Sequence, residues 1–160
     1  GGWRAWPKEL KNPQSPEVKK FKTENRKAVN FFKFLQYWAE KQLEDVQKKI
    51  EERGLKIGLY RDLPVGLCKD SAELWSENDL FIKDCGAGAP PDIFFPTGQK
   101  WCLGAFNPYK LKANAYRPFI KILRAAMENA GAIRIDHVMS LQRLYIIPDA
   151  SEKGTYVLIK

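Results

Sequence analysis

Apolar residues recur with a helical period through the first third of the chain. Between Val18 and Glu52 there is no proline or glycine, and apolar residues follow one another at steps of three and four. These residues are Leu35, Trp38, Ala39, Leu43, Val46 and Ile50. The spacing places them on one face of a helix, so it predicts a long amphipathic helix over 18–52, with a break between Thr23 and Asn30.

The period changes to two after Gly54, which we expect to end the helix. Apolar residues then alternate with polar or small ones over residues 55–60, a pattern typical of a strand. This strand runs into Asp62 and Pro64, so an acidic residue follows the point where the strand stops.

A second strand is predicted over Ile133–Asp136, after an amphipathic helix over 117–130 that Gly131 ends. Two isoleucines occupy one face of this strand, and Arg134 and Asp136 occupy the other. We expect the strand to be buried, so its charged face needs an explanation. One explanation is a structural ion pair, and the other is an arginine that keeps a nucleophilic carboxylate ionised.

The order helix, glycine, strand and acid thus occurs twice, which predicts an α/β protein with parallel strands. In a (β/α)8 barrel the catalytic residues gather at the carboxyl ends of the strands, where Asp62 and Asp136 fall. Such a barrel takes about 250 residues. This chain has 160 residues, with a third candidate strand at Tyr156–Ile159. The fold prediction is therefore a partial (β/α)8 TIM barrel with a long N-terminal helical region.

We expect residues 1–160 to be a fragment of one domain with three parts. Residues 1–17 mix tryptophan with proline and predict an extended segment. Residues 18–53 form the helical region, and residues 54–160 supply barrel strands, helices and a loop. That loop, over 85–108, is rich in glycine and proline, and its aromatic residues predict an ordered binding loop.

The composition narrows the class of function. The formal net charge is +8, but the excess lies in early helix and loop positions without a nucleic-acid-binding motif, so we expect no nucleic-acid partner. Cys68, Cys85 and Cys102 form no close pair, and only His137 could join them, which argues against a metal site and favours a reducing compartment. No signal peptide and no apolar run of about 18 residues is present, so we expect a soluble cytoplasmic protein without a membrane partner.

Several short motifs follow one another along the chain: Gly58–Gly66, Asp70–Trp75, Gly88–Asp92, Gly98–Trp101 and Arg134–His137. Their order resembles that in 4-α-glucanotransferases, the amylomaltases or disproportionating enzymes of glycoside hydrolase family 77. The chain resembles the middle of the catalytic barrel of that family, and the resemblance extends to 34–38 and 143–148.

The resemblance implies a retaining exchange at α-1,4-glucan linkages, with α-1,4-glucans and maltooligosaccharides as partners and with no cofactor. Asp136 matches the family's nucleophile, Arg134 would hold and ionise it, and His137 would contact sugar hydroxyls. A retaining mechanism needs a second carboxyl about 5 Å from the nucleophile. The family places that residue in a Gly-Glu-Asp motif beyond the position of Lys160, so we expect these 160 residues alone to be inactive.

Other residues have a substrate-binding interpretation and a structural one. Asp62 resembles a strand-end carboxylate that shapes the sugar subsites, or is a turn residue. Ser71 and Trp75 would bind substrate, or would be a helix N-cap and a packed aromatic.

The candidate binding loop carries further predicted contacts. Pro90, Pro91 and Asp92 resemble a mobile loop over the acceptor side of the cleft. Gln99 and Trp101 follow in the same motif, and Trp101 would stack on a sugar ring or belong to the core. The chain departs from the family at Cys102, where glycine is usual, which leaves the shape of that part of the loop open.

An alternative from another class is a non-catalytic glucan-binding or interaction module derived from the same barrel. Because an unclosed barrel exposes sheet edges, we also expect that two copies could associate through such edges.

Overall fold

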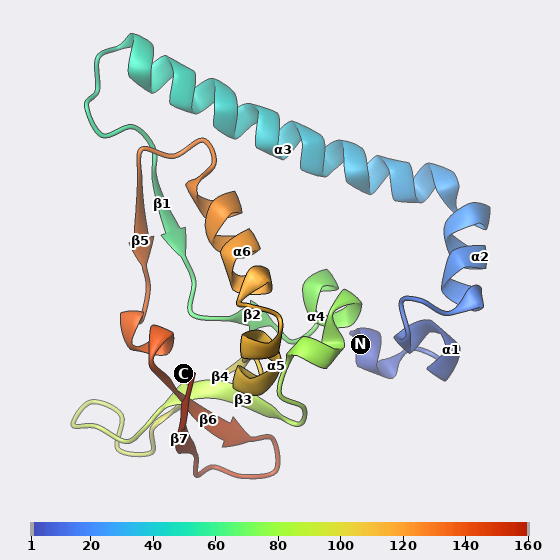
Figure 1. Cartoon of the computed structure of the whole chain (residues 1–160), viewed down its shortest axis with the longest axis vertical. Coiled ribbons are helices and arrows are strands. Elements are labelled where there is room, and N and C mark those ends of the chain that lie inside the picture. The colour runs from blue at the N-terminus through green and yellow to red at the C-terminus, as the bar shows by residue number, and fades with distance from the viewer. Residues whose placement is uncertain (1, 160) are drawn as a thin grey trace. The chain divides into compact units, whose positions relative to one another are not determined.

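A computed structural model describes residues 2–159, which divide into two compact units. We call Trp6–Leu63 with Ile122–Arg134 the helix unit. Residues 2–5, 64–121 and 135–159 form the sheet unit. Figure 1 shows the long helix α3 of the first unit and the antiparallel strands of the second.

The predicted long helix is present as α2, Pro16–Glu24, and α3, Arg26–Glu52, and the break at Asn25 lies in the predicted interval. Ser15 caps α2 by accepting a hydrogen bond from the backbone N–H of Val18 at 3.1 Å. Gly54 ends α3 with φ +70°, as predicted. The N–H groups of Gly54 and Leu55 donate to carbonyls of the last turn at 2.9 and 3.2 Å, which closes the helix as a Schellman motif.

The extended segment predicted over residues 1–17 is wrong in part. A 3₁₀ turn, η1, spans Trp3–Ala5, a short helix, α1, spans Lys8–Lys11, and α2 begins at Pro16. The prolines do not prevent these helices, because Pro7 precedes α1 and Pro16 occupies the first turn of α2, where a missing N–H costs nothing.

The two predicted strands pair with each other. They are β1, Tyr60–Leu63, and β5, Ala132–Ile135, which form a two-stranded sheet whose arrows point the same way in Figure 1. Strand β1 starts later than predicted, because the N–H of Leu59 donates to Gln47 Oε1 of α3 at 2.7 Å instead of to a strand. The expectation that Ile133–Asp136 is a buried strand is wrong: no residue of β5 is buried, since a single neighbouring strand leaves both faces partly accessible.

Helix α6, Arg117–Met127, precedes β5, and its end is built differently from the prediction. Asn129, with φ +52°, makes the left-handed turn predicted for Gly131. Arg61 of β1 donates from Nη1 to the carbonyls of Ala125 and Glu128 at 3.1 and 2.8 Å. Gly131 serves a close approach, because a Cβ there would lie 1.4 Å from the carbonyl oxygen of Ile57.

The sheet unit is built on five strands in the order β2-β4-β3-β6-β7, and every neighbouring pair is antiparallel. The strands are β2 Leu67–Cys68, β3 Cys85–Ala89, β4 Gln99–Gly104, β6 Arg143–Pro148 and β7 Thr155–Leu158. A strand is present where the third one was predicted, since β7 spans Thr155–Leu158, but it pairs antiparallel with β6, so the expectation that it joins parallel barrel strands is wrong. The described residues contain no closed barrel, so the α/β class is confirmed at the level of element content.

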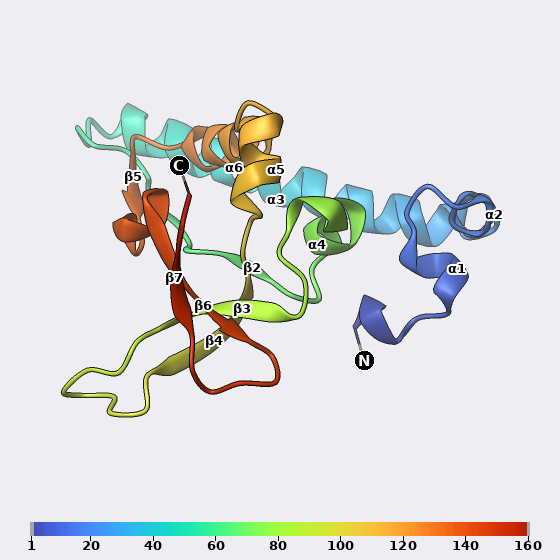
Figure 2. The same ribbon diagram turned by 60° about the horizontal axis from the view of Figure 1, so that its bottom comes forward.

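The segment 85–108, predicted as one irregular loop, contains a β-hairpin. Strands β3 and β4 pair in it, and only residues 90–98 form the connection, which extends beyond the sheet in Figure 2. The glycines of β3 mark close packing: a Cβ at Gly88 would lie 2.2 Å from the carbonyl oxygen of Gln99 and 2.6 Å from Ile147.

The core of the sheet unit is formed mainly by residues of its strands. Its buried cluster is Cys85, Ala87, Ala105, Leu144 and Ile146. The helix for which Ser71 was a predicted N-cap is present as α4, Ala72–Ser76, and α5 spans Pro108–Ala113. Two 3₁₀ turns, η2 at Asn78–Leu80 and η3 at Val138–Leu141, complete the unit. Leu74 of α4 packs against Gly104, where an added Cβ would lie 2.4 Å from the leucine side chain.

Candidate active site

The turn that carries Asp136 follows directly on β5. His137 has φ 49° and ψ 56°, in the left-handed region that residues other than glycine seldom adopt. Helical turn η3 begins at the next residue, and the N–H of Ser140 donates to the carbonyl of His137 at 2.8 Å. Asp136 is half-buried. The predicted nucleophile therefore lies in a tight turn at the carboxyl end of a strand.

Three of the predicted site residues lie together in the sheet unit. The rings of Trp101 and His137 meet edge to face, with centroids 5.1 Å apart and planes at 85°. The indole Nε1 of Trp101 donates to Gln99 Oε1 at 3.1 Å. Trp101 also packs against the buried cluster, so both of its predicted roles, sugar platform and core residue, are compatible with its position.

Arg134 and Asp62 lie in the helix unit and form an ion pair between β5 and β1. Nη1 of Arg134 is 3.1 Å from Oδ2 of Asp62, and their side chains are 50% and 62% exposed. Such an exposed pair contributes at most about 1 kcal/mol. The ion pair of Arg134 with Asp62 was not predicted, because Arg134 was paired with Asp136 alone. Period-two alternation on two neighbouring parallel strands could have indicated the pair with Asp62 as well.

Ser71 is the N-cap of α4, which is the structural interpretation given above. Its Oγ accepts a hydrogen bond from the N–H of Leu74 at 3.3 Å. Trp75 is half-buried on the same helix. The N-terminal segment is fixed nearby, since Trp3 Nε1 donates to the carbonyl of Lys69 at 3.0 Å and Arg4 pairs with Asp70 at 3.4 Å.

Pro90, Pro91 and Asp92 lie in the connection between β3 and β4. Oδ1 of Asp92 accepts hydrogen bonds from the N–H groups of Phe94 and Phe95 at 2.8 and 2.7 Å, which orders the tip. Ile93 and Phe94 are nevertheless 93% and 86% exposed. An internally bonded tip that presents apolar side chains to solvent is typical of a binding surface.

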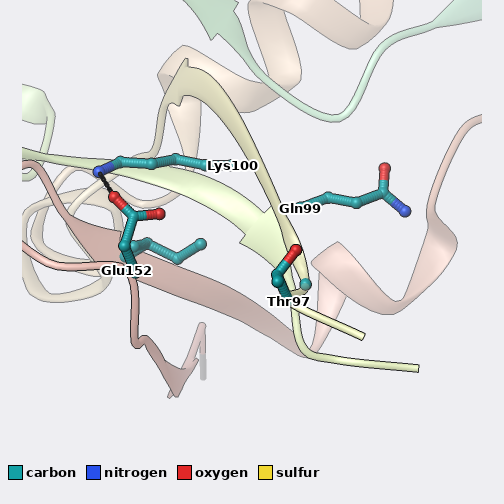
Figure 3. A pocket seen from close by; sticks show the side chains of 6 residues that line it. Thr97, Gln99, Lys100 and Glu152 are labelled. Carbon is teal, nitrogen blue, oxygen red and sulfur yellow. Dashed lines mark ion pairs between the residues drawn. The ribbon is translucent and has the colours of Figure 1, made fainter. Parts of the chain in front are cut away.

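A hollow of about 330 Å³ lies beside the same hairpin and was not predicted from the sequence. It is lined by Thr97, Gly98, Gln99, Lys100, Ile147 and Glu152. Figure 3 shows Lys100 pointing toward Glu152, with Nζ 3.6 Å from Oε1, whereas Gln99 points the other way. Lys100 also donates to the carbonyls of Asp149 and Ser151, so its charge mainly fixes the connection between β6 and β7.

Neither a membrane span nor a metal cluster is found in the part of the chain that the structure describes. No helix there is long and apolar enough to cross a bilayer. No group of three or more histidine, cysteine, aspartate or glutamate side chains among residues 2–159 is arranged to hold a metal ion.

Curated relatives match nearly the whole chain. A 4-alpha-glucanotransferase of Haemophilus influenzae is 40% identical over 158 residues, which cover 98% of this chain and 23% of the relative. One of Mycobacterium tuberculosis is 38% identical over 157 residues, covering 97% of this chain and 22% of the relative. The chain thus spans less than a quarter of the length of these relatives.

Solved structures give the same assignment. The amylomaltase of Corynebacterium glutamicum superposes with a TM-score of 0.80 at 31% identity, over 84% of this chain and 20% of that one. The amylomaltase of Streptococcus agalactiae in complex with acarbose superposes with a TM-score of 0.88 over 99% of this chain and 34% of that one, and at 19% identity it supports the fold alone. The family model described as 4-alpha-glucanotransferase matches residues 1–160. The chain belongs to the 4-alpha-glucanotransferase family.

Proposed function

We propose that this chain supplies the nucleophile and part of the sugar cleft of an enzyme that transfers α-1,4-glucan segments between maltodextrins. The observation that carries the proposal is the position of Asp136, at the end of β5 and next to a histidine in contact with Trp101. Family membership supports the same reaction class.

The proposed reaction is a retaining double displacement. Asp136 attacks the anomeric carbon, the glycosidic bond breaks, and the leaving glucan oxygen takes a proton from a second carboxyl group. The 4-hydroxyl of an acceptor glucan then attacks the glucosyl ester, returns its proton to that second carboxyl and releases Asp136. We assign the second carboxyl to sequence outside these 160 residues, on the resemblance described above.

Substrate contacts follow from the same assignment. Trp101 offers an aromatic face to a sugar ring, and His137 and Gln99 offer polar groups beside it. Pro90, Pro91 and Asp92 would approach the acceptor from the ordered tip of the hairpin. Asp62, Ser71 and Trp75 are proposed as outer contacts, and Ser71 would combine that role with its function as an N-cap.

A chimaera tests the proposal. This chain would replace the matching 158 residues of the Haemophilus influenzae relative, and glucose and longer maltodextrins would be measured after incubation with maltotriose. We expect transfer activity, and we expect Asp136→Asn to lower it by about 10³-fold or more. The matched control is Asp79→Asn, an exposed acid on η2, which should retain full activity. Equal activity of both variants would refute Asp136 as the nucleophile.

The isolated chain gives a second test. We predict that residues 1–160 alone, incubated with maltotriose, produce neither glucose nor longer maltodextrins, because the proposed acid/base group is not among them. If the isolated chain binds maltoheptaose while an otherwise folded chimaera stays inactive, the result favours the non-catalytic glucan-binding module.

We also propose a cytoplasmic location, which the three free cysteines support.

A further inference from the structure

We propose that Gln99 is a positioning residue for the turn that carries Asp136, and that it acts through Trp101 and His137. The proposal deepens the proposed function and rests on it in one respect, the naming of Asp136 as the nucleophile. Every contact that it uses lies within the sheet unit.

The turn at Asp136 needs support from its surroundings. His137 adopts φ 49°, a left-handed conformation that is strained for a residue with a Cβ. Such a conformation persists when neighbouring groups determine it. The ring contact with Trp101, at 5.1 Å between centroids, is a side-chain contact that restrains the imidazole. The direction of Asp136, one residue earlier, is therefore tied to the position of the indole.

The indole is held at two points. Its ring packs against the buried cluster that includes Ala87 and Leu144, and its N–H donates to Gln99 Oε1 at 3.1 Å. The N–H of a half-buried indole usually needs a hydrogen-bond partner, so the orientation that places Nε1 at Gln99 Oε1 is favoured over the flipped one. Gln99 is the residue that pairs with Ala89 where the hairpin connection begins, so the acceptor itself stands on a hydrogen-bonded strand.

Gln99 and Asp136 lie far apart in the sequence. Gln99 lies on β4 beside the candidate binding loop, and Asp136 follows β5. A change at Gln99 should alter the turn at Asp136 without any change in the turn's own sequence. Loss of a direct sugar contact by Gln99 would not have that effect in the absence of sugar.

The test uses the whole 160-residue chain without substrate. His137 is the single histidine of the sequence, so its imidazole C–H resonances are assigned without ambiguity by NMR. We expect these resonances to be displaced from random-coil positions by the ring current of Trp101. Gln99→Leu should return them toward random coil and change the amide coupling that reports φ of His137. Gln99→Glu should preserve both signals, because a carboxylate accepts the same hydrogen bond.

A control and a second variant keep the outcome decisive. Gln36→Leu makes the same chemical change at an exposed glutamine of α3 and should leave His137 unaffected. In a Trp101→Phe background, which has a ring but no N–H donor, Gln99→Leu should have no further effect on His137. Unchanged His137 signals in Gln99→Leu, or an equal Gln99→Leu effect in the Phe background, would overturn the proposal. Neither result bears on transfer activity, which the chimaera measures separately.

Discussion

The two units of the chain differ in the burial of their apolar residues. The sheet unit buries a compact cluster, in which Ala87 is fully enclosed and Leu144 is 4% exposed. None of the 27 residues of α3 in the helix unit is buried, although its apolar stripe is well formed. Phe31, Phe34, Leu35 and Trp38 are all more than 40% exposed. Amphipathic spacing therefore predicts the helix reliably but says nothing of what covers its apolar face.

Helix α3 has a closing motif at its C-terminal end and ion pairs along its surface, whereas its N-cap residue, Asn25, makes no side-chain capping hydrogen bond. Lys41 and Lys48 flank Glu44 at 2.6 and 2.7 Å, and the Schellman motif at Gly54 closes the last turn. Gln47 and Glu40 tie its second half to residues 59 and 129. The sheet unit depends instead on side-chain packing, so equivalent substitutions should have different consequences in the two units.

The largest difference is expected for truncation of apolar side chains. Ile146→Ala in the sheet core should lower the free energy of unfolding by about 2–5 kcal/mol. Leu35→Ala, on the exposed face of α3, should lower it by no more than about 0.5 kcal/mol. Urea unfolding followed through amide resonances of β3, β6 and α3 would measure both. A comparable loss at Leu35 would mean that the face of α3 is packed in solution.

Gly131→Ala tests the closest backbone approach in the helix unit. A Cβ there would lie 1.4 Å from the carbonyl oxygen of Ile57, so the chain must move and stability should fall by about 1–3 kcal/mol or more. Gly54→Ala is the comparison, because its added Cβ meets no atom within 4 Å. Its cost should be about 1 kcal/mol, from the left-handed φ alone. Thermal unfolding should rank Gly131→Ala as the more damaging change.

Cys102→Gly should stabilise the sheet unit by about 1 kcal/mol, since Cys102 holds φ 57° on an exposed position of β4. Residues 101 and 102 lie where the pairing of β3 with β4 shifts between Ala87 and Gly88, a bulge that favours glycine. The matched change Cys68→Gly, on an exposed strand position, should destabilise by about 0.5–1 kcal/mol. A Tm that falls for both variants would contradict the strain at Cys102.

The smallest effect is expected when pH is lowered, and it concerns the stability of α3. Hydrogen bonds from Lys41 and then Lys48 lower the pKa of Glu44 to about 2. A lowered carboxyl pKa adds stability that is complete above the ordinary value of 4.5 and is lost as pH falls toward 2. Helicity measured by circular dichroism should therefore decrease slightly over this range, and Glu44→Gln should remove that part of the decrease. High salt should weaken the effect, because the groups are accessible to solvent.

Sequence patterns predicted the elements that have a clear period. They failed where the local structure depends on close packing at a glycine or on contact with a residue far away in the sequence. The break near Asn25, the end at Gly54 and the cap at Ser71 follow from local rules, and the structure confirms them. Strand β3 was missed, because Gly86 and Gly88 resemble a turn in sequence while they serve close packing in the sheet. The proximity of Gln99, Trp101 and His137 could not be read from spacing, since it depends on where the hairpin meets the turn after β5.

The guanidinium of Arg61 connects β1 to the end of α6, two elements that lie far apart in the sequence. It bonds to carbonyls of Ala125 and Glu128, which are 64 and 67 residues away, at the end of α6. The last turn of α6 thus lacks its full set of partners until β1 is in place, and β1 pairs with the strand that α6 leads into. Helix ending and strand pairing should consequently occur as one cooperative folding step. Arg61→Ala would separate them, because it removes the Nη1 donor that serves both carbonyls.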